Sequence, residues 1–432
     1  MSNILKRLSR ILDGPGGRQG LEGVPSRPRA LVLNHFAVPP GAPGGTRHVE
    51  LFQRLTAWDS TIIASNFSSQ TGTRVRGSDQ LKTVPVVPYT SNGVGRILNW
   101  GSYAVTGTLR GLLCGPADIV YGSTPHLLTP LSAWLLSRIK GAAFVVEIRD
   151  LWPKVLLDMG VLSETSPMFR ALTAVEEFIY SQADAIIVMA EGSRTELTRR
   201  GFGEKDIYYI PNGADPEDFV SAMPRDVLRE KYGMRRLTGV YVGAHGPANG
   251  LDLLLKAADE ASNVDIVLVG GGPEKARLQQ WARDQNLQNV RFLDAVPKTE
   301  VPDILAAADF GLHVLADVEL FRTSVSPNKV FDYMAVGLPV LSNSPGLVAD
   351  LLMSAEAGLA VGPCELGAGL RDMASQSEAS RQQLGENGRL WLSQNQSRTI
   401  MAQRLASALE TTRSQSLNAS RIRVRRRGPA EH

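Results

Sequence analysis

The chain has 432 residues, 43% of them hydrophobic and 21% charged, with a formal net charge of +3. This length exceeds the size at which single cores stop growing and favours two domains. Only two cysteines occur, Cys114 and Cys364, and their wide separation argues against a disulfide framework or a zinc site and favours a cytoplasmic protein. No basic face is interleaved with aromatic residues, which argues against nucleic-acid binding.

The first 28 residues combine a short amphipathic segment with a Gly/Pro-rich linker, DGPGGRQGLEGVPSRP. One helical stripe carries Ile4, Leu5, Leu8, Ile11 and Leu12. The cations off this stripe are Lys6, Arg7 and Arg10. Such a pattern is typical of a helix at an anionic membrane surface, although a solvated extension is the alternative. The segment is too short and charged to span a bilayer and lacks the signature of a secretory signal. We expect peripheral attachment at the inner face of the cell membrane.

Apolar runs then alternate with amphipathic segments in a first domain, residues 29–215. The runs expected to form strands are 30–36, 60–65, 117–123, 142–150 and 184–190. The segments expected to form helices are 48–57, 127–139 and 167–182. This alternation predicts βαβ units and a parallel sheet with helices on both faces.

A second series of the same kind occupies residues 216–395, after a turn-rich stretch at 207–219 that marks the hinge. The sequence therefore predicts an α/β protein with two doubly wound, Rossmann-like domains facing a cleft, where ligands bind outside the carboxyl ends of the strands. A helix near 386–410 is a candidate to cross back onto the first domain. Residues 396–432 hold the end of that helix and a basic tail, in which Arg421–Arg427 includes five arginines.

The stretch VGGGPEKAR (269–277) places three glycines after a predicted strand. It departs from the dinucleotide fingerprint, because Lys275 stands where a third spaced glycine or alanine is required. Backbone amides at Gly271 and Gly272 are candidates to face a phosphate or sugar. The alternative is a tight turn that begins a helix.

The stretch SVSPNKVFDYMAVGLPVLSNSPG (324–346) predicts a short helix with an exposed start. Ser326 is a suitable N-cap and Pro327 a suitable first residue, so free amides and the positive end of the dipole would point into the cleft. Lys329 in the first turn opposes that dipole unless an anion is bound. Asp332, one turn further, could accept hydrogen bonds from vicinal hydroxyls. The alternative is a surface Lys–Asp pair.

Several motifs taken together resemble the family-four glycosyltransferases of the GT-B fold. They are PGAPGGTRHVELFQRL, IPNGAD, VLVGGGP, NVRFLDAVP, AADFGLHVL and SPNKVFDYMAVGLPVL. The resemblance runs from about residue 30 to about residue 395. VVEIRDLWPKVLLDMGVL and the Ser-Pro-x-Lys helix are most similar to bacterial O-antigen and capsule enzymes of the N-acetylfucosamine transferase type.

The resemblance implies retaining transfer of a sugar from a nucleotide-diphosphate donor, with UDP the expected nucleotide, to a polyprenyl-linked or glycan acceptor. By position, Asp332 matches the second acid of the family's E-x7-E motif, which binds ribose. Lys329 and Arg322 are placed for the diphosphate. The remaining implied donor contacts are Gly44, Gly45, His245, Gly246, Gly271, Gly272, Ser324, Ser326, Pro327 and Asn328. Asp150, with Arg149 and Lys329, is the candidate for the catalytic group.

The sequence departs from the family pattern in three places. Ser324 stands in place of the first acid of E-x7-E, and Arg149 in place of a histidine before Asp150. Ala244 and Asn249 replace the family's Arg and Lys after the first strand of the second domain. The last change leaves Lys329, Arg322 or His245 to neutralise the diphosphate.

Acceptor contacts are expected from Arg47 and His126, although a histidine at the latter position is more often structural. The apolar segment 96–113 is interpreted as core packing or as a surface that enters a bilayer. No Asp-x-Asp triplet occurs in the sequence, so we expect neither a metal nor another cofactor. Two alternative functions remain open, a nucleotide-sugar 2-epimerase of the same fold and a non-catalytic glycosyltransferase-like partner.

Overall fold

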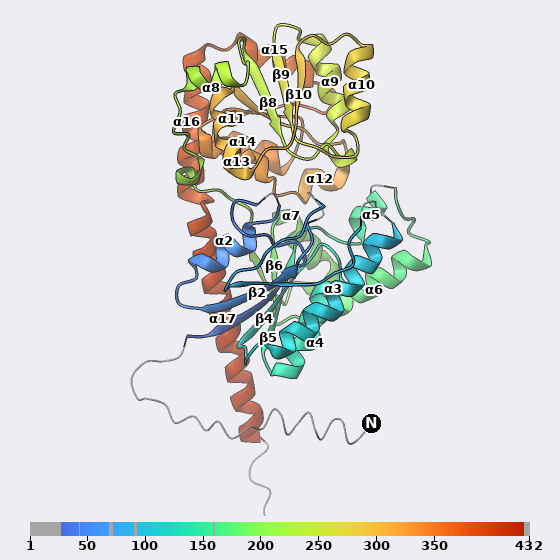
Figure 1. Ribbon diagram of the computed structural model, residues 1–432. Coiled ribbons are helices and arrows are strands. Elements are labelled where there is room, and N and C mark those ends of the chain that lie inside the picture. Colours follow the sequence, from blue (N-terminus) through green and yellow to red (C-terminus); the bar gives the residue numbers. More distant parts are fainter. Residues whose placement is uncertain (1–26, 43, 69–71, 90–92, 159, 427–432) are drawn as a thin grey trace, which may run out of the picture.

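The computed structural model describes residues 27–426 apart from 43, 69–71, 90–92 and 159 (Figure 1). The predicted amphipathic segment at residues 1–12 lies outside the described residues, as do the side chains of residues 420–426 in the basic tail. Within the described residues, no helix has both the length and the apolarity needed to cross a bilayer.

The first domain is built on a seven-stranded parallel sheet in the order β3-β2-β1-β4-β5-β6-β7. Its strands are β1 (Arg29–Leu33), β2 (Asp59–Ser65), β3 (Leu81–Val84), β4 (Ile119–Ser123), β5 (Ala143–Ile148), β6 (Ala185–Val188) and β7 (Asp206–Tyr209). Its helices are α2 (Arg47–Arg54), α3 (Val94–Leu113), α4 (Leu128–Lys140), α5 (Lys154–Asp158), α6 (Pro167–Gln182) and α7 (Glu191–Leu197).

The second domain is built on a six-stranded parallel sheet in the order β10-β9-β8-β11-β12-β13. Its strands are β8 (Thr238–Val242), β9 (Asp265–Val269), β10 (Val290–Leu293), β11 (Phe310–His313), β12 (Val340–Ser342) and β13 (Gly358–Ala360). Its helices are α8 (Arg225–Lys231), α9 (Leu251–Glu260), α10 (Lys275–Asp284), α11 (Val301–Ala307), α12 (Glu319–Thr323), α13 (Asn328–Val336), α14 (Leu347–Ser354), α15 (Leu366–Ser375) and α16 (Glu378–Asn395). The predicted fold class is confirmed.

The predicted strands form because their apolar runs are buried on both faces of the sheet. In β1, Ala30 and Val32 enter one core cluster while Leu31 and Leu33 enter the other. Continuous apolar runs are what a doubly covered parallel sheet requires. Strands β3 and β7 have only half-buried or polar residues at several positions, so their sequences LKTV and DIYY do not stand out as strands.

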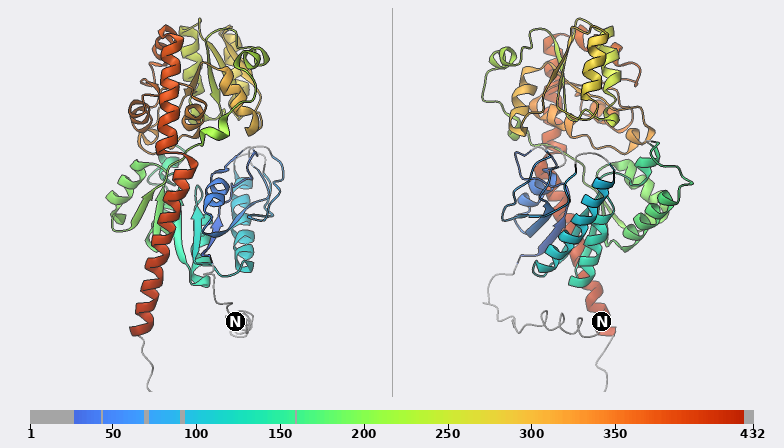
Figure 2. Two further views of the ribbon diagram at one scale, coloured as in Figure 1. Left: turned by 90° about the vertical axis from the view of Figure 1, so that its left-hand side faces the viewer. Right: turned by 45° about the vertical axis from the view of Figure 1, so that its right-hand side comes forward.

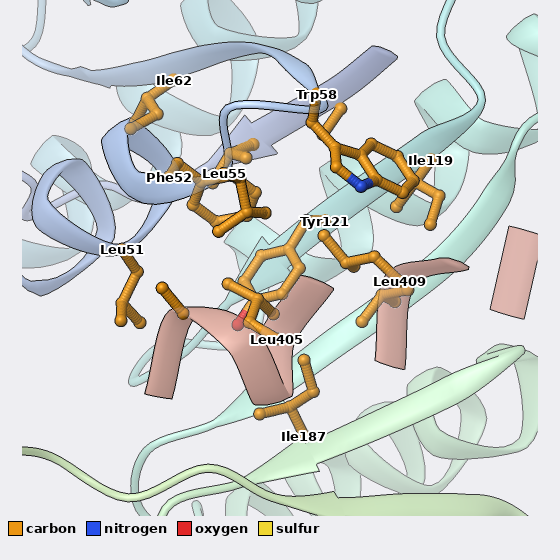
Figure 3. Close-up of a cluster of buried hydrophobic side chains, with 14 of the residues drawn as sticks. Leu51, Phe52, Leu55, Trp58, Ile62, Ile119, Tyr121, Ile187, Leu405 and Leu409 are labelled. Carbon is orange, nitrogen blue, oxygen red and sulfur yellow. The ribbon is translucent and has the colours of Figure 1, made fainter. Parts of the chain in front are cut away.

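The long helix α17 (Arg398–Arg426) returns from the second domain and runs along the first, as both views of Figure 2 show. Its residues Met401, Leu405 and Leu409 are buried against the sheet and against Phe52 of α2 (Figure 3). The segment 396–432 therefore supplies part of the first domain's core, in addition to its tail.

We predict that Leu405→Ala lowers the unfolding free energy of the first domain by about 2–5 kcal/mol, because Leu405 is almost completely buried and its removal leaves a cavity. Leu417→Ala, on the same helix at a position 43% exposed, is the matched control and should change it by less than about 0.5 kcal/mol. Urea unfolding followed by circular dichroism measures both. Equal effects would show that α17 does not contribute to this core.

Candidate functional site

Loops that follow strands of both sheets meet between the domains. The loop after β10 carries Lys298, whose Nζ donates hydrogen bonds to Thr46 Oγ1 at 2.8 Å and to Glu50 Oε1 at 2.8 Å on the first domain. Asn212, in the loop after β7, binds the segment before α13. The carboxyl ends of the two parallel sheets therefore face one another, which is where open α/β sheets bind ligands.

Four of the predicted site residues line one cavity of the first domain, of about 250 Å³. Gly44 and Gly45 come from the loop after β1, and Arg149 and Asp150 follow β5. Gly44 has φ +135°, a backbone conformation that favours glycine. At Gly45 a Cβ atom would lie 3.8 Å from Arg149 Nη1, so the loop backbone approaches the guanidinium closely. The structure thus brings the glycine loop and the Arg149–Asp150 pair together.

Asp150 lines this cavity and is exposed to solvent. Partial desolvation by the surrounding protein raises the pKa of Asp150, while the positive charge of Arg149 opposes the rise. The backbone N–H of Arg149 donates to Thr124 Oγ1 at 2.8 Å, which fixes the end of β5. The proton affinity of Asp150 is therefore above that of an ordinary aspartate.

Arg47 lies inside the first domain and not at an acceptor site, so the sequence interpretation of this residue needs correction. Its side chain is buried and donates to the carbonyl oxygens of Ile210 at 2.6 Å and Pro211 at 2.5 Å. The guanidinium also contacts the buried carboxylate of Glu147 at 3.4 Å. A buried cation requires such partners. Arg47 therefore ties the glycine-loop helix to the interdomain segment.

His126 is also buried, behind the wall of the cavity, which corrects its assignment as an acceptor contact. Its Nε2 is 2.7 Å from Nδ1 of His35, and its ring stacks on Trp100 with centroids 4.9 Å apart. Burial lowers the pKa of His126 well below its usual value, with a smaller contribution from the charge of Arg96. Of this pair, His35 is the residue that lines the cavity.

In the second domain, the loops after β8 and β9 are joined by backbone hydrogen bonds. The N–H of His245 donates to Gly271 O at 2.8 Å, and that of Glu274 donates to His245 O at 3.0 Å. A side chain at Gly272 would collide with the His245 backbone, so glycine is required there. Gly271 has open space in front of it, and Gly246 lines a cavity of about 230 Å³ beside Glu274.

His245 cannot neutralise a diphosphate in the way the sequence allowed. The ring is completely buried, and desolvation together with the charges of Lys275 and Lys329 lowers its pKa to about 4. At neutral pH the ring is uncharged.

Arg322 is half-exposed and pairs with Asp317 at 2.9 Å and with Glu319 at 3.2 Å, so its charge is already balanced.

Lys329 is the remaining candidate cation, in the first turn of α13. Its Nζ lies 3.4 Å from Asn249 Oδ1 and 5.1 Å from the centre of the Tyr241 ring. A side chain at Gly243 would collide with Lys329 Cε, so this glycine makes room for the lysine. Desolvation lowers the pKa of Lys329 to about 8, and the more distant Asp332 only partly compensates. Among the described residues, no carboxylate oxygen lies within 4.0 Å of Nζ.

The start of α13 differs in detail from the prediction. The helix begins at Asn328, which is exposed, with Pro327 at the cap position. Ser326 does not cap the helix, because its Oγ accepts a hydrogen bond from the Asn212 backbone N–H at 2.9 Å. Ser326 O accepts from Asn212 Nδ2 at 2.6 Å. The serine therefore attaches the helix start to the interdomain loop, and the first amides of α13 keep no side-chain cap.

Asp332 lies one turn along α13 and is half-buried in a second cavity, of about 450 Å³, between the domains. Desolvation raises its pKa to about 6, while Lys298 and Arg398 oppose the rise. Ser324, the predicted neighbour from the E-x7-E position, is buried at the end of α12. A hydroxyl there cannot supply the second negative charge.

Sequence reasoning missed an ionic cluster in the same cavity. Glu50 accepts from Lys298 at 2.8 Å and from Arg398 Nε at 2.8 Å, and these two cations lower its pKa to about 2 against the effect of desolvation. Glu50 lies 248 positions from Lys298 and 348 positions from Arg398 along the chain, and the two cations are 100 positions apart. No local pattern could have linked them.

Two family models match the chain, one on each domain. "Glycosyl transferase 4-like domain" matches residues 45–213 and "Glycosyl transferases group 1" matches residues 226–391. The two matches begin at Gly45, the last glycine of the first-domain loop, and include Asp150, both glycine-rich loops of the second domain and α13. The chain is a glycosyltransferase whose two domains each match a glycosyltransferase family model.

Individual relatives are distant. WcaI of Escherichia coli (strain K12), which carries the name of a colanic acid biosynthesis glycosyl transferase, is 24% identical over 64% of this chain and 70% of its own. The GDP-mannose-dependent alpha-mannosyltransferase of Corynebacterium glutamicum is 22% identical over 56% of this chain and 54% of its own.

Among solved structures, sucrose-phosphate synthase from Thermosynechococcus elongatus superposes with a TM-score of 0.72 at 16% identity, covering 89% of this chain and 99% of its own. Anabaena HepE in complex with UDP-glucose superposes with a TM-score of 0.64 at 17% identity, covering 89% and 99%. At these identities the similarity establishes the two-domain GT-B fold and no more.

We predict that the Lys329 ammonium titrates near pH 8 in the unbound protein, because the surrounding protein disfavours its charged form. Since this value lies below the 10.5 of an ordinary lysine, the unfolded chain binds more protons and stability rises with pH between about 8 and 10.5. NMR of ¹³C-methylated lysines measures the titration. The variant Lys329→Met identifies the signal by removing it, and a midpoint above 10 would contradict the desolvated site.

Proposed function

We propose that this glycosyltransferase moves a sugar, with retention of anomeric configuration, from a UDP-sugar to a polyprenyl-linked or glycan acceptor in cell-surface polysaccharide biosynthesis. The observation that carries the proposal is the half-buried Lys329 ammonium, which lies at the uncapped start of α13 and lacks a nearby carboxylate among the described residues. Such a cation is suited to an anionic ligand. A bound diphosphate would supply the missing negative charge and raise the pKa of the lysine.

The donor is proposed to lie along the second domain. Its diphosphate would contact Lys329 and the first amides of α13, and its ribose hydroxyls would donate to Asp332. The backbone of Gly271 is open on the same side of the sheet. UDP is proposed as the nucleotide, in line with the UDP-glucose bound to the HepE structure, a protein of the same fold.

The acceptor is proposed to occupy the first-domain cavity beside Asp150 and Arg149. In the reaction, the bond between the anomeric carbon and the diphosphate oxygen breaks, and the leaving nucleotide takes the electron pair. The acceptor oxygen bonds to the anomeric carbon and its proton passes to a base. Asp150 would orient the acceptor hydroxyl, and Lys329 would stabilise the charge that develops on the leaving group.

The place of the reaction is proposed to be the cytoplasmic face of the cell membrane. A polyprenyl-linked acceptor requires the enzyme to reach a bilayer, and the name of the E. coli relative refers to colanic acid, a polysaccharide product. Closure of the two domains would exclude water, because hydrolysis of the donor competes with transfer.

The test is an assay of UDP-sugar donors against an undecaprenyl-linked acceptor extract, with mass spectrometry of the lipid product. The proposal expects UDP release and sugar transfer only when acceptor is present. A 2-epimerase would convert the donor without acceptor. A non-catalytic partner would show no turnover, and absence of UDP and GDP binding in calorimetry would identify it.

Replacement of Lys329 by alanine is expected to lower turnover roughly 100-fold or more, the range seen when one charge-stabilising group is removed from an active site. The matched control is Lys256→Ala on α9, an exposed lysine of the same domain. Initial rates of sugar transfer, with circular dichroism to verify folding, measure the effect. A rate unchanged in Lys329→Ala would remove this residue from the mechanism.

Transfer is expected to continue in excess EDTA, because lysine and helix amides supply the charge that a divalent metal would otherwise supply. In the part of the chain described, no group of three or more His, Cys, Asp or Glu side chains is placed to hold a metal ion. Rates are measured before and after chelation and after addition of Mn²⁺. Loss of activity that Mn²⁺ restores would contradict metal independence.

A further inference from the structure

Helix α3 has its apolar residues on the side that faces solvent. The side packed on the first domain carries Asn99, Tyr103, Gly107 and Gly111, spaced four residues apart. The exposed side carries Val94 (72% exposed), Ile97 (60%), Leu98 (55%), Val105 (61%), Leu109 (57%), Leu112 (40%) and Leu113 (79%). Figure 2 (right) shows this helix, in cyan, on the outside of the first domain.

The buried side of α3 explains how the helix is attached without its leucines. Tyr103 OH donates to Ile63 O at 2.7 Å and Asn99 Nδ2 donates to Val87 O at 2.7 Å. Gly111 allows close packing, since a Cβ atom there would collide with Leu136 of α4. Folding of the domain thus does not use the apolar outer stripe. Contiguous exposed apolar residues of this extent mark an interaction surface.

The surface continues onto α4, which packs against α3. Leu135 and Ile139 of α4 are 43% and 50% exposed. We call the exposed aliphatic residues of α3 and α4 the α3–α4 face. A cavity of about 520 Å³ opens beside it, between β3 and α3, lined by Leu109, Leu113 and Arg110 among others.

Cations outnumber acids around this face. Residues 79–146 contain five cations, Lys82, Arg96, Arg110, Arg138 and Lys140, and two acids, Asp79 and Asp118. Both acids already have partners: Asp79 lies 3.9 Å from Lys82, and Asp118 accepts from the backbone N–H of Arg29 at 2.8 Å and lies 3.4 Å from Arg413. Such a face is complementary to an anionic membrane surface, because the apolar stripe can contact the acyl chains while the bordering cations contact the negatively charged headgroups.

We propose that the α3–α4 face is a membrane-binding surface that inserts its aliphatic side chains into an anionic lipid bilayer. The inference rests on the exposed stripe and its charge and not on the predicted N-terminal segment. One consequence does rest on the proposed function. Arg96, in the first turns of α3, also lines the first-domain cavity, so bilayer contact would place the opening for a lipid-linked acceptor beside the headgroups.

The test measures binding of the full chain to vesicles by sedimentation, with phosphatidylglycerol–phosphatidylcholine vesicles compared with phosphatidylcholine alone. We expect binding to the anionic vesicles that weakens with salt. The double variant Leu109→Ser/Leu113→Ser is expected to lower the apparent affinity about tenfold or more. The matched control is Met353→Ser/Leu390→Ser, exposed residues of the second domain at 74% and 58%, which should bind as the unaltered chain does.

A third variant, Lys6→Ser/Arg7→Ser/Arg10→Ser, separates the α3–α4 face from the N-terminal segment. The proposal would be overturned if Leu109→Ser/Leu113→Ser bound the anionic vesicles normally while Lys6→Ser/Arg7→Ser/Arg10→Ser lost vesicle binding. The proposal would also be overturned if the chain did not bind vesicles but formed concentration-dependent dimers in light scattering, and if Leu109→Ser/Leu113→Ser abolished those dimers. The face would then bind a second copy of the chain. UDP calorimetry on the same samples reports the donor site separately, so failure of the proposed function and failure of the surface are distinguishable.

Discussion

A half-buried cation that has no carboxylate within 4.0 Å among the residues the structure describes is the constraint around which the second domain's loops are arranged. Lys329 keeps its place through Asn249, the ring of Tyr241 and the space left by Gly243. These contacts position an ammonium without neutralising it, because an amide oxygen and an aromatic face carry no net charge. A site with this imbalance is more favourable with an anion present than without one.

The sequence resemblance predicts that Ala244 and Asn249 stand where the family has basic residues, and the structure shows how Asn249 contacts the remaining cation. Asn249 accepts a hydrogen bond from Lys329 where a lysine would have repelled it. His245, beside it, is neutral and buried and supports the neighbouring glycine loop through its backbone. The positive charge of the site is thereby concentrated on one side chain of α13.

The two domains are held together by charged and polar contacts near this site. Glu50 binds Lys298 of the second domain and Arg398 at the start of α17, and Asn212 binds Ser326 before α13. The Glu50–Arg398 pair is largely buried and therefore costly to break, whereas Lys298 is about one-third exposed. The apolar interactions of α17 lie farther along, in the first domain.

Much of the fold followed from the sequence alone, because apolar runs buried on both faces of a parallel sheet form a strong local signal. The same signal located the loops that follow the strands, and with them Gly44, Asp150, Gly271 and Lys329.

What only the tertiary structure decided was the partner of each polar side chain. Arg47, His126 and Ser326 stand next to site motifs in the sequence, yet they bind Ile210, His35 and Asn212, far away along the chain. Likewise α3 and α17 both carry leucines at helical spacing, and only packing determined that Leu405 is enclosed while Leu109 faces solvent. The physical reason is that hydrophobic periodicity reflects the local conformation of neighbouring residues and therefore predicts helices and strands. Burial and hydrogen-bond partners depend instead on segments that meet only once the chain has folded.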